Sequence, residues 1–159
     1  MDEILSILEK NCRYTEEQLA VMTGKSPQEV NESIRNYEKE NVIVGYTALV
    51  NWEKTEIENV TAFIEIKVTP QRGEGFDKVA ERIYKFPQVK ACYLMSGSFD
   101  LCVIIEGKSM KEVALFVAEK LAPLESVQST ATHFVLKKYK DKGTIFDDKL
   151  EDGREAIFI

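Results

Sequence analysis

The chain has 159 residues, 44% of them hydrophobic and 30% charged, with a formal net charge of −6 at pH 7. This length suits one ordinary domain or two small ones, and no apolar run approaches the roughly 20 residues that cross a bilayer. We therefore expect a cytoplasmic protein without an export signal. The acidic balance disfavours non-specific nucleic-acid binding by the whole molecule, because phosphate contacts need concentrated Lys and Arg.

Three cysteines and one histidine limit the chemistry that the chain can carry. Cys12, Cys92 and Cys102 are far apart and odd in number, each within an apolar stretch, so we expect buried free thiols. His133 is alone, which argues against most histidine-rich metal sites and leaves one candidate for a catalytic pair. The composition therefore predicts no metal site, no cofactor and no enzyme active site.

Three helices are predicted within the first 40 residues. Apolar residues at helical spacing indicate the first over residues 2–10. The second begins at a capping box over residues 15–18 and ends at Gly24, which suits a left-handed C-terminal position. The third begins at residues 26–29, which combine an N-cap Ser with Pro and Glu in the first turn, and runs to about Glu40. Two short helices joined by a Gly-containing turn are typical of a helix-turn-helix.

The third helix and the residues after it are the predicted DNA-binding surface. Val30, Ile34 and Tyr37 mark its inner face, which leaves its polar side chains pointing outward. The β-rich residues 42–44 and 46–50, hinged at Gly45, predict a two-stranded wing. Gln and Asn can pair with adenine, Arg with guanine and Glu with cytosine. The DNA-binding residues that we predict are Lys25, Ser26, Gln28, Asn31, Glu32, Arg35 and Lys39.

The charge of this region opposes that interpretation. Residues 1–52 contain nine Asp and Glu but only five Lys and Arg, namely Lys10, Arg13, Lys25, Arg35 and Lys39. The third helix itself carries four Glu residues, and carboxylates beside phosphates cancel favourable contacts. Two alternatives remain open. Either a dimer doubles a weak half-site on DNA, or the helix-turn-helix is kept for packing or partner contacts.

The remaining chain predicts a linker over residues 51–59, a βαββαβ domain over 60–142 and a C-terminal extension over 143–159. The domain's predicted elements are, in order, a strand over 62–68, a helix over 76–84, strands over 89–95 and 101–105, a helix from Ser109 to about Pro123, and a strand over 130–139. This order is the ferredoxin-like arrangement, an antiparallel sheet with both helices on one face. The fold class is α+β, and the uncovered face predicts a homodimer.

Two features lie at and beyond the end of the last predicted strand. Lys137, Lys138, Lys140 and Lys142 form a basic cluster, which we interpret as a solvated face. The extension ends in the apolar residues 156–159, which predict a strand added to a sheet edge, because burial of such side chains is favourable.

Four passages resemble the Lrp/AsnC (leucine-responsive/asparagine-responsive) family of transcriptional regulators. They are SPQEVNESIRNYEKENVIVGY, NWEK, SGSFDL and ESVQSTATHFVL, in the family's order and spacing. The resemblance implies a winged helix-turn-helix before a ferredoxin-like domain of the RAM (ACT-like) type, which dimerises. It also implies octamers built from dimers in many members, and an amino acid bound where dimers meet.

A loop and a threonine pair are the predicted effector site. Gly97 and Asp100 match the family's Gly-x-x-Asp loop, where free amides can hold a carboxylate and Asp100 can accept from an ammonium group. Thr130 and Thr132 match the family's threonine pair. The predicted effector-binding residues are Ser96, Gly97, Ser98, Asp100, Thr130 and Thr132. The alternative is a hairpin turn that Asp100 caps without any ligand.

An enzyme remains the alternative from a different class. Some tetrapyrrole (sirohaem) decarboxylases resemble this family in both domains and use histidines in a pocket. His133 is the one histidine available for that role here. We favour His133 as an ordinary strand residue and the chain as a ligand-responsive regulator.

Overall fold

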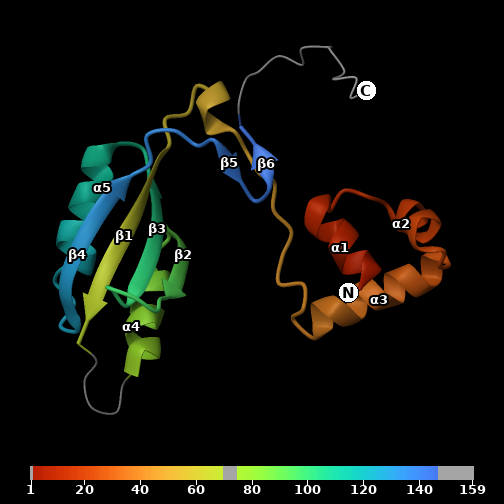
Figure 1. Cartoon of the computed structure of the whole chain (residues 1–159), viewed down its shortest axis with the longest axis horizontal. Helices are drawn as coiled ribbons and strands as arrows, with labels where there is room; N and C mark the ends of the chain where they lie inside the picture. The colour runs from red at the N-terminus through yellow and green to blue at the C-terminus, as the bar shows by residue number, and fades with distance from the viewer. Residues whose placement is uncertain (1, 70–74, 147–159) are drawn as a thin grey trace, which may run out of the picture. The chain divides into compact units, whose positions relative to one another are not determined.

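The computed structural model describes residues 2–69 and 75–146 (Figure 1). The chain divides into two compact units, Met1–Val50 and Asn51–Ile159. Within the described residues, no helix is long and apolar enough to cross a bilayer.

The first unit contains the three predicted helices, α1 (Glu3–Lys10), α2 (Glu16–Thr23) and α3 (Pro27–Lys39). Each contributes to one small core, whose buried members are Ile4, Leu8, Leu19, Ala20 and Val30. Ile34 and Tyr37 pack against that core from α3, which confirms the predicted inner face. Because these side chains come from all three helices, the apolar stripes fix how α3 lies on α1 and α2.

The predicted capping signals also form. The Thr15 hydroxyl accepts from the amide of Gln18 at 3.3 Å, and the Gln18 side chain accepts from the amide of Thr15 at 2.9 Å. Gly24 ends α2 with a φ of 68°, a left-handed conformation that glycine adopts without strain. A second capping box begins α3 at Ser26. Local sequence chemistry therefore sets the boundaries of both helices.

The two-stranded wing is not observed. Residues 42–50 belong to no strand in the described structure, and Val44 is 88% exposed. A short two-stranded hairpin is marginal by itself in water, and only Ile43 of the predicted wing strands packs against the core of this unit. β-propensity therefore predicted strands where the single chain offers neither a pairing partner nor a surface to cover them.

The second unit has the predicted βαββαβ order after a short 3₁₀ turn at Trp52–Lys54. Its elements are β1 (Val60–Val68), α4 (Gly75–Tyr84), β2 (Val89–Leu94), β3 (Leu101–Gly107), α5 (Met110–Phe116) with a π-helical turn over Val117–Leu121, and β4 (Val127–Phe134). The strands pair antiparallel in the order β2-β3-β1-β4. The ferredoxin-like prediction is confirmed.

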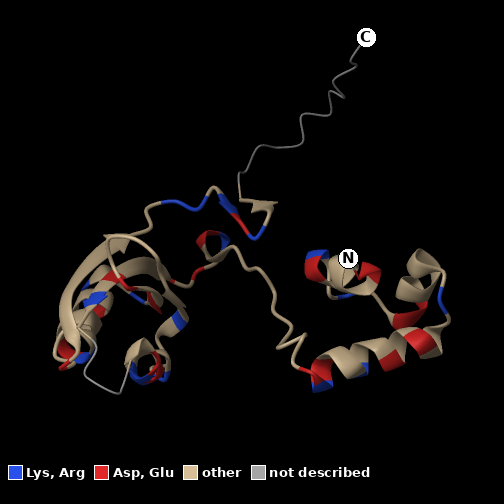
Figure 2. Cartoon of the chain, turned by 60° about the horizontal axis from the view of Figure 1, so that its bottom comes forward, with Lys and Arg blue, Asp and Glu red and all other residues tan. Residues whose placement is uncertain are grey.

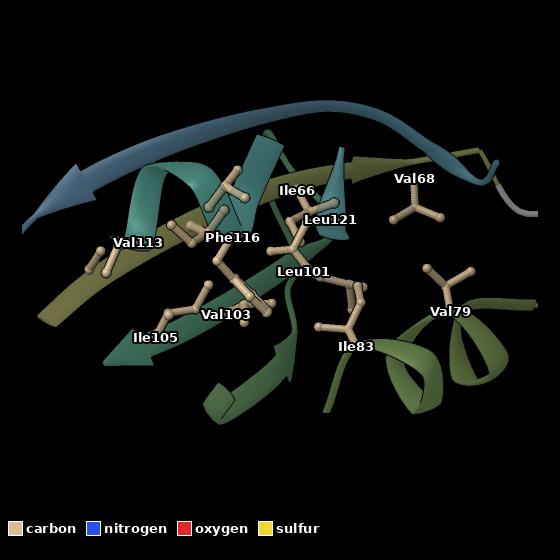
Figure 3. Packing of buried hydrophobic residues seen from close by; sticks show 13 residues of the cluster. Ile66, Val68, Val79, Ile83, Leu101, Val103, Ile105, Val113, Phe116 and Leu121 are labelled. Carbon is tan, nitrogen blue, oxygen red and sulfur yellow. The ribbon is translucent and has the colours of Figure 1, made fainter. Parts of the chain in front are cut away.

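Strand alternation places one side of this sheet in the core. Ala62, Ile64 and Ile66 are fully buried, and β3 adds the buried side chains of Leu101, Val103 and Ile105. Figure 3 shows these side chains meeting those of α4 and α5, including Val79, Ile83, Val113 and Phe116. Both helices therefore cover the same face, and the other face carries no helix from the described part of the chain.

The last strand differs from the prediction, which placed it over residues 130–139. It begins at Val127 and ends at Phe134, which pairs with Ala62 near the start of β1. The Val135 amide still donates to the carbonyl of Thr61 at 2.9 Å, but the pairing with β1 goes no further, and Leu136 is 85% exposed. The chain then forms a small separate hairpin of β5 (Lys140–Asp141) and β6 (Thr144–Ile145). The edge strand predicted at residues 156–159 lies outside the described residues.

Candidate DNA-binding and effector sites

One stripe of side chains on α3 lies opposite its buried face. Gln28, Glu32, Arg35 and Lys39 are all exposed. Their spacing of four, three and four residues places them in one row along the helix. Because the buried Val30 occupies the other side, this row is the outermost line of α3. A docking element must present such a row to its partner.

Two other predicted DNA-binding residues have partners within the protein. The Ser26 hydroxyl donates to the carboxylate of Glu29 at 2.7 Å and accepts from its amide at 3.3 Å. The Asn31 side-chain amide donates to Glu16 on α2. Both side chains thus hold the helix-turn-helix together, a role that the sequence prediction assigned only to Ser26 as a cap.

Charge around the start of α3 is mixed. Hydrogen bonds from the amide and hydroxyl of Ser26, together with the nearby cation of Lys25, lower the pKa of Glu29. Glu29 therefore stays ionised at neutral pH, at the same end of the helix as Lys25. Figure 2 shows red acidic positions alternating with the few blue basic ones on the three helices. The predicted surplus of carboxylates thus lies on the helices themselves.

A hydroxyl-carboxylate pair links the two ends of this unit. The Tyr37 hydroxyl on α3 donates to Asp2, which also caps α1 by accepting from the amide of Ile4 at 3.0 Å. The bond lowers the pKa of Asp2 and raises the pKa of Tyr37 to about 12. No local pattern predicts this pair, because the two residues are 35 positions apart in the chain.

Asp100, in the predicted effector loop, binds the protein backbone. Its carboxylate accepts from the amide of Val68 at 2.7 Å, and its own amide donates to the carbonyl of Ile66 at 3.0 Å. Its carbonyl accepts from the amide of Met95 at 2.8 Å, which closes the loop. The pairing of β1 with β4 shifts register between Lys67 and Val68, next to this contact. Asp100 thus fastens the loop to the end of β1.

The threonine pair is on the other flank of β1. Thr130 and Thr132 pair with Ile66 and Ile64, so both face the helix side of the sheet. Ser96, Gly97 and Ser98 are exposed, and Gly97 has a φ of 155°. One chain therefore places the loop and the threonines at the same end of the sheet but on opposite sides of β1. None of these residues lines the hollow of about 400 Å³ found beside α5, which Gln88 and Phe116 help to form.

The uncovered sheet face combines apolar and charged side chains. Phe63 and Tyr93 are 41% and 53% exposed there. His133 and Glu65 lie on the same face with Nε2 and Oε1 3.3 Å apart, and their side chains are 59% and 40% exposed. No cluster of His, Cys, Asp and Glu that could hold a metal ion occurs among the described residues. His133 is therefore a strand residue facing solvent or a partner.

The three cysteines are free, as predicted, but they are not all buried. Cys12 is exposed, because it lies in the turn between α1 and α2 rather than within a helix. Burial raises the pKa of the Cys92 and Cys102 thiols. These two are therefore poor nucleophiles at neutral pH.

Known proteins match both units. The profile of the Lrp/AsnC ligand-binding domain matches residues 61–145, and a profile of winged helix-turn-helix DNA-binding domains matches residues 3–44. The chain belongs to the Lrp/AsnC family. The family resemblance seen in the sequence is confirmed, together with its fold class.

Individual relatives of this Lrp/AsnC protein cover most of its length. The uncharacterized HTH-type transcriptional regulator YugG of Bacillus subtilis is 52% identical over 98% of this chain and 94% of its own. The leucine-responsive regulatory protein of Escherichia coli K12 is 28% identical over 89% and 86% of the two chains. The crystal structure of transcriptional regulator NMB0573 of Neisseria meningitidis with L-Met aligns with a TM-score of 0.72 and 25% identity, over 89% and 93%.

Two of these relatives are named as transcriptional regulators and the third as a regulatory protein, and the matching N-terminal domain is a DNA-binding one. The chain is accordingly an Lrp/AsnC-type helix-turn-helix transcriptional regulator and not an enzyme. This finding contradicts the alternative of a tetrapyrrole decarboxylase, for which His133 was the one candidate residue.

Proposed function

We propose that this regulator binds specific DNA sequences by laying α3 in the major groove. The observation that carries the proposal is the single exposed row of Gln28, Glu32, Arg35 and Lys39, opposite the buried face of the same helix. From its first to its last residue the row is about 16 Å long, which suits a helix lying in a groove. Arg35 is suited to guanine, Gln28 to adenine and Glu32 to the amino group of cytosine.

A second copy of the chain completes the proposed reader. The uncovered face of the sheet, with Phe63 and Tyr93 exposed, is the surface that we assign to a homodimer. Two copies related by a twofold axis present two α3 rows to two half-sites, which doubles the contacts of a weakly binding unit. Dimers of this kind are also the building blocks of the octamers that the family resemblance implies.

We further propose that the second unit binds an amino acid or a similar small effector. The matched profile is that of a ligand-binding domain, and the NMB0573 structure contains L-Met. The amides around Gly97 and Ser98 are available to a carboxylate in an exposed loop. Because Thr130 and Thr132 lie on the far side of β1 from that loop, residues from a neighbouring dimer are needed to enclose a ligand.

The DNA-binding proposal is tested by fluorescence anisotropy with a duplex taken from upstream of the protein's own gene, at about 50 mM salt. We expect salt-sensitive binding by the intact chain, weakened by about tenfold in Arg35→Ala, which corresponds to one good base contact. Lys90→Ala, an exposed lysine of the second unit, serves as the matched control and leaves the affinity unchanged. Absence of binding by the intact chain contradicts the proposal.

That negative outcome favours the second candidate function, a family member that acts through ligand or partner binding alone. The observation behind it is the charge of the first unit, where nine acidic residues accompany five basic ones. Isothermal titration of the protein with each of the twenty amino acids tests the effector separately. A silent panel favours the interpretation of the loop as a turn that Asp100 caps without a ligand.

A further inference from the structure

The lysine cluster near the end of the described chain is part of an ordered hairpin. We call residues 137–146 the basic hairpin, which contains Lys137, Lys138, Lys140 and Lys142 but only one acid, Asp141. Figure 2 shows a run of basic positions, drawn in blue, in the first part of the basic hairpin. Lys137, Lys140 and Lys142 are exposed, whereas the Lys138 side chain is 27% exposed and lies 3.7 Å from Asp141.

Backbone pairing gives the basic hairpin a defined shape. Lys140 pairs with Ile145 and Asp141 with Thr144, while the amide of Phe146 donates to the carbonyl of Tyr139 at 2.9 Å. The two turn residues, Lys142 and Gly143, have φ values of 44° and 81°. Positive φ at both positions is the geometry of the tight turns that match strand twist. The turn presents Lys142 at the tip.

Aromatic rings support two of the lysines. The Lys137 ammonium lies 5.0 Å from the centre of the Tyr139 ring, and Lys138 lies 5.7 Å from that of Phe146. Such contacts already restrict these long side chains, so each side chain loses less conformational entropy when it binds a partner. Tyr139 itself is 67% exposed. The surface thus combines concentrated positive charge with an aromatic ring, which suits a polyanion.

The charge of the first unit indicates that this polyanion is DNA. Non-specific attraction to DNA comes from Lys and Arg that neutralise phosphates, yet residues 1–52 carry a net charge of −4, from five basic and nine acidic residues. Residues 137–146 carry a net charge of +3, from four lysines and the single Asp141. The basic hairpin therefore supplies positive charge that the helix-turn-helix lacks.

We propose that the basic hairpin is a second DNA-contacting element, which binds the phosphate backbone through Lys137, Lys140 and Lys142 without reading bases. The inference rests on the proposed DNA-binding function and deepens it. Base readout belongs to the α3 row, and the hairpin contributes affinity that does not depend on sequence. Its contribution is strongly salt-dependent, because each phosphate contact releases condensed counterions.

The test compares two triple variants of the full-length chain that remove the same charge. The first is Lys137→Gln, Lys140→Gln and Lys142→Gln. The control is Lys90→Gln, Lys108→Gln and Lys111→Gln, three exposed lysines elsewhere in the second unit. Affinity for the target duplex and for a scrambled duplex is measured between about 50 and 200 mM salt.

We expect the hairpin variant to bind both duplexes more weakly and with a shallower salt dependence. The slope of log affinity against log salt falls by about 0.9 for each phosphate that the variant no longer neutralises, or about 2.7 for three. The control keeps a slope close to that of the unaltered chain. If the unaltered chain binds DNA and both variants have its slope, the hairpin inference is overturned and the function of α3 stands. If the unaltered chain binds no DNA, both fall.

A measurement without substitutions guards against altered folding. Lysine acetylation of the unaltered protein, followed by mass spectrometry, reports which ammonium groups a bound duplex covers. We expect Lys137, Lys140 and Lys142 to be protected by the duplex, while Lys90 and Lys111 react as they do in the free protein. Equal reactivity of the three hairpin lysines with and without the duplex contradicts the inference.

Discussion

Replacement of Asp100 by Ala removes the side-chain hydrogen bond between the 96–100 loop and β1, whereas the backbone bond from the Asp100 amide to the Ile66 carbonyl remains. The Asp100 carboxylate accepts from the amide of Val68 at 2.7 Å in a partly buried position. A hydrogen bond to a charged group contributes roughly 1.5–3 kcal/mol, and an amide left without an acceptor adds to the destabilisation. We therefore expect Asp100→Ala to lower the free energy of unfolding by about 2 kcal/mol.

The assay is thermal unfolding of the full-length protein, followed by circular dichroism. In a unit of about 100 residues, 2 kcal/mol corresponds to a fall in Tm of about 10 °C. Asp100→Asn keeps an acceptor oxygen for the Val68 amide, so its Tm falls less. Glu125→Ala, which removes an exposed acid, is the control and leaves Tm within about 2 °C.

This pair of variants also separates the two roles considered for Asp100. If Asp100→Asn keeps the Tm of the unaltered protein but no longer binds an amino acid, the carboxylate contacts the effector as well as Val68. An Asp100→Ala protein as stable as the unaltered one contradicts this prediction, because the bond to Val68 then contributes nothing measurable.

Three further predictions concern the core, acid stability and the sheet face. Ile64→Ala, at a fully buried position, lowers the free energy of unfolding by about 2–5 kcal/mol in urea denaturation, and a decrease below about 1 kcal/mol contradicts the assigned core. The pKa values of Asp2 and Glu29 lie below their ordinary values of 3.8 and 4.5. The two ionised carboxylates therefore stabilise the folded protein above those ordinary values, and this stabilisation disappears as the pH falls through the lowered pKa values. Unfolding midpoints measured from about pH 6 to pH 2 should fall, and they should fall less steeply in Ser26→Ala. Phe63→Asp places a charge on the uncovered sheet face and should shift the protein towards monomer in sedimentation, whereas an unchanged mass excludes that face as the dimer contact.

The periodicity of apolar residues and the helix-capping residues made most of the fold predictable from the sequence. The alternation of Ala62, Ile64 and Ile66 predicted the buried face of β1, and Ser26 and Gly24 predicted helix ends, because each signal acts within a few residues. The predictions of two wing strands within residues 42–50 and of a last strand that runs to residue 139 were wrong for one shared reason. β-propensity describes a residue's fitness for a sheet, while the presence of a neighbouring strand depends on distant parts of the chain.

The candidate sites were less accessible to sequence reasoning. The outward row on α3 follows from helical spacing, so its members could be named in advance. The hydrogen bonds from Asn31 to Glu16 and from the Val68 amide to Asp100 could not be predicted, because they join residues 15 and 32 positions apart. These bonds give two of the side chains predicted to bind DNA or effector a structural role that residue type alone does not reveal.

The ratio of affinities for a target and a scrambled duplex measures whether α3 reads bases. For Arg35→Ala we expect this ratio to fall by about tenfold while affinity for the scrambled duplex falls much less, because a base contact provides discrimination and a phosphate contact does not. Equal decreases on both duplexes, or no discrimination by the unaltered protein, would show that α3 does not read bases.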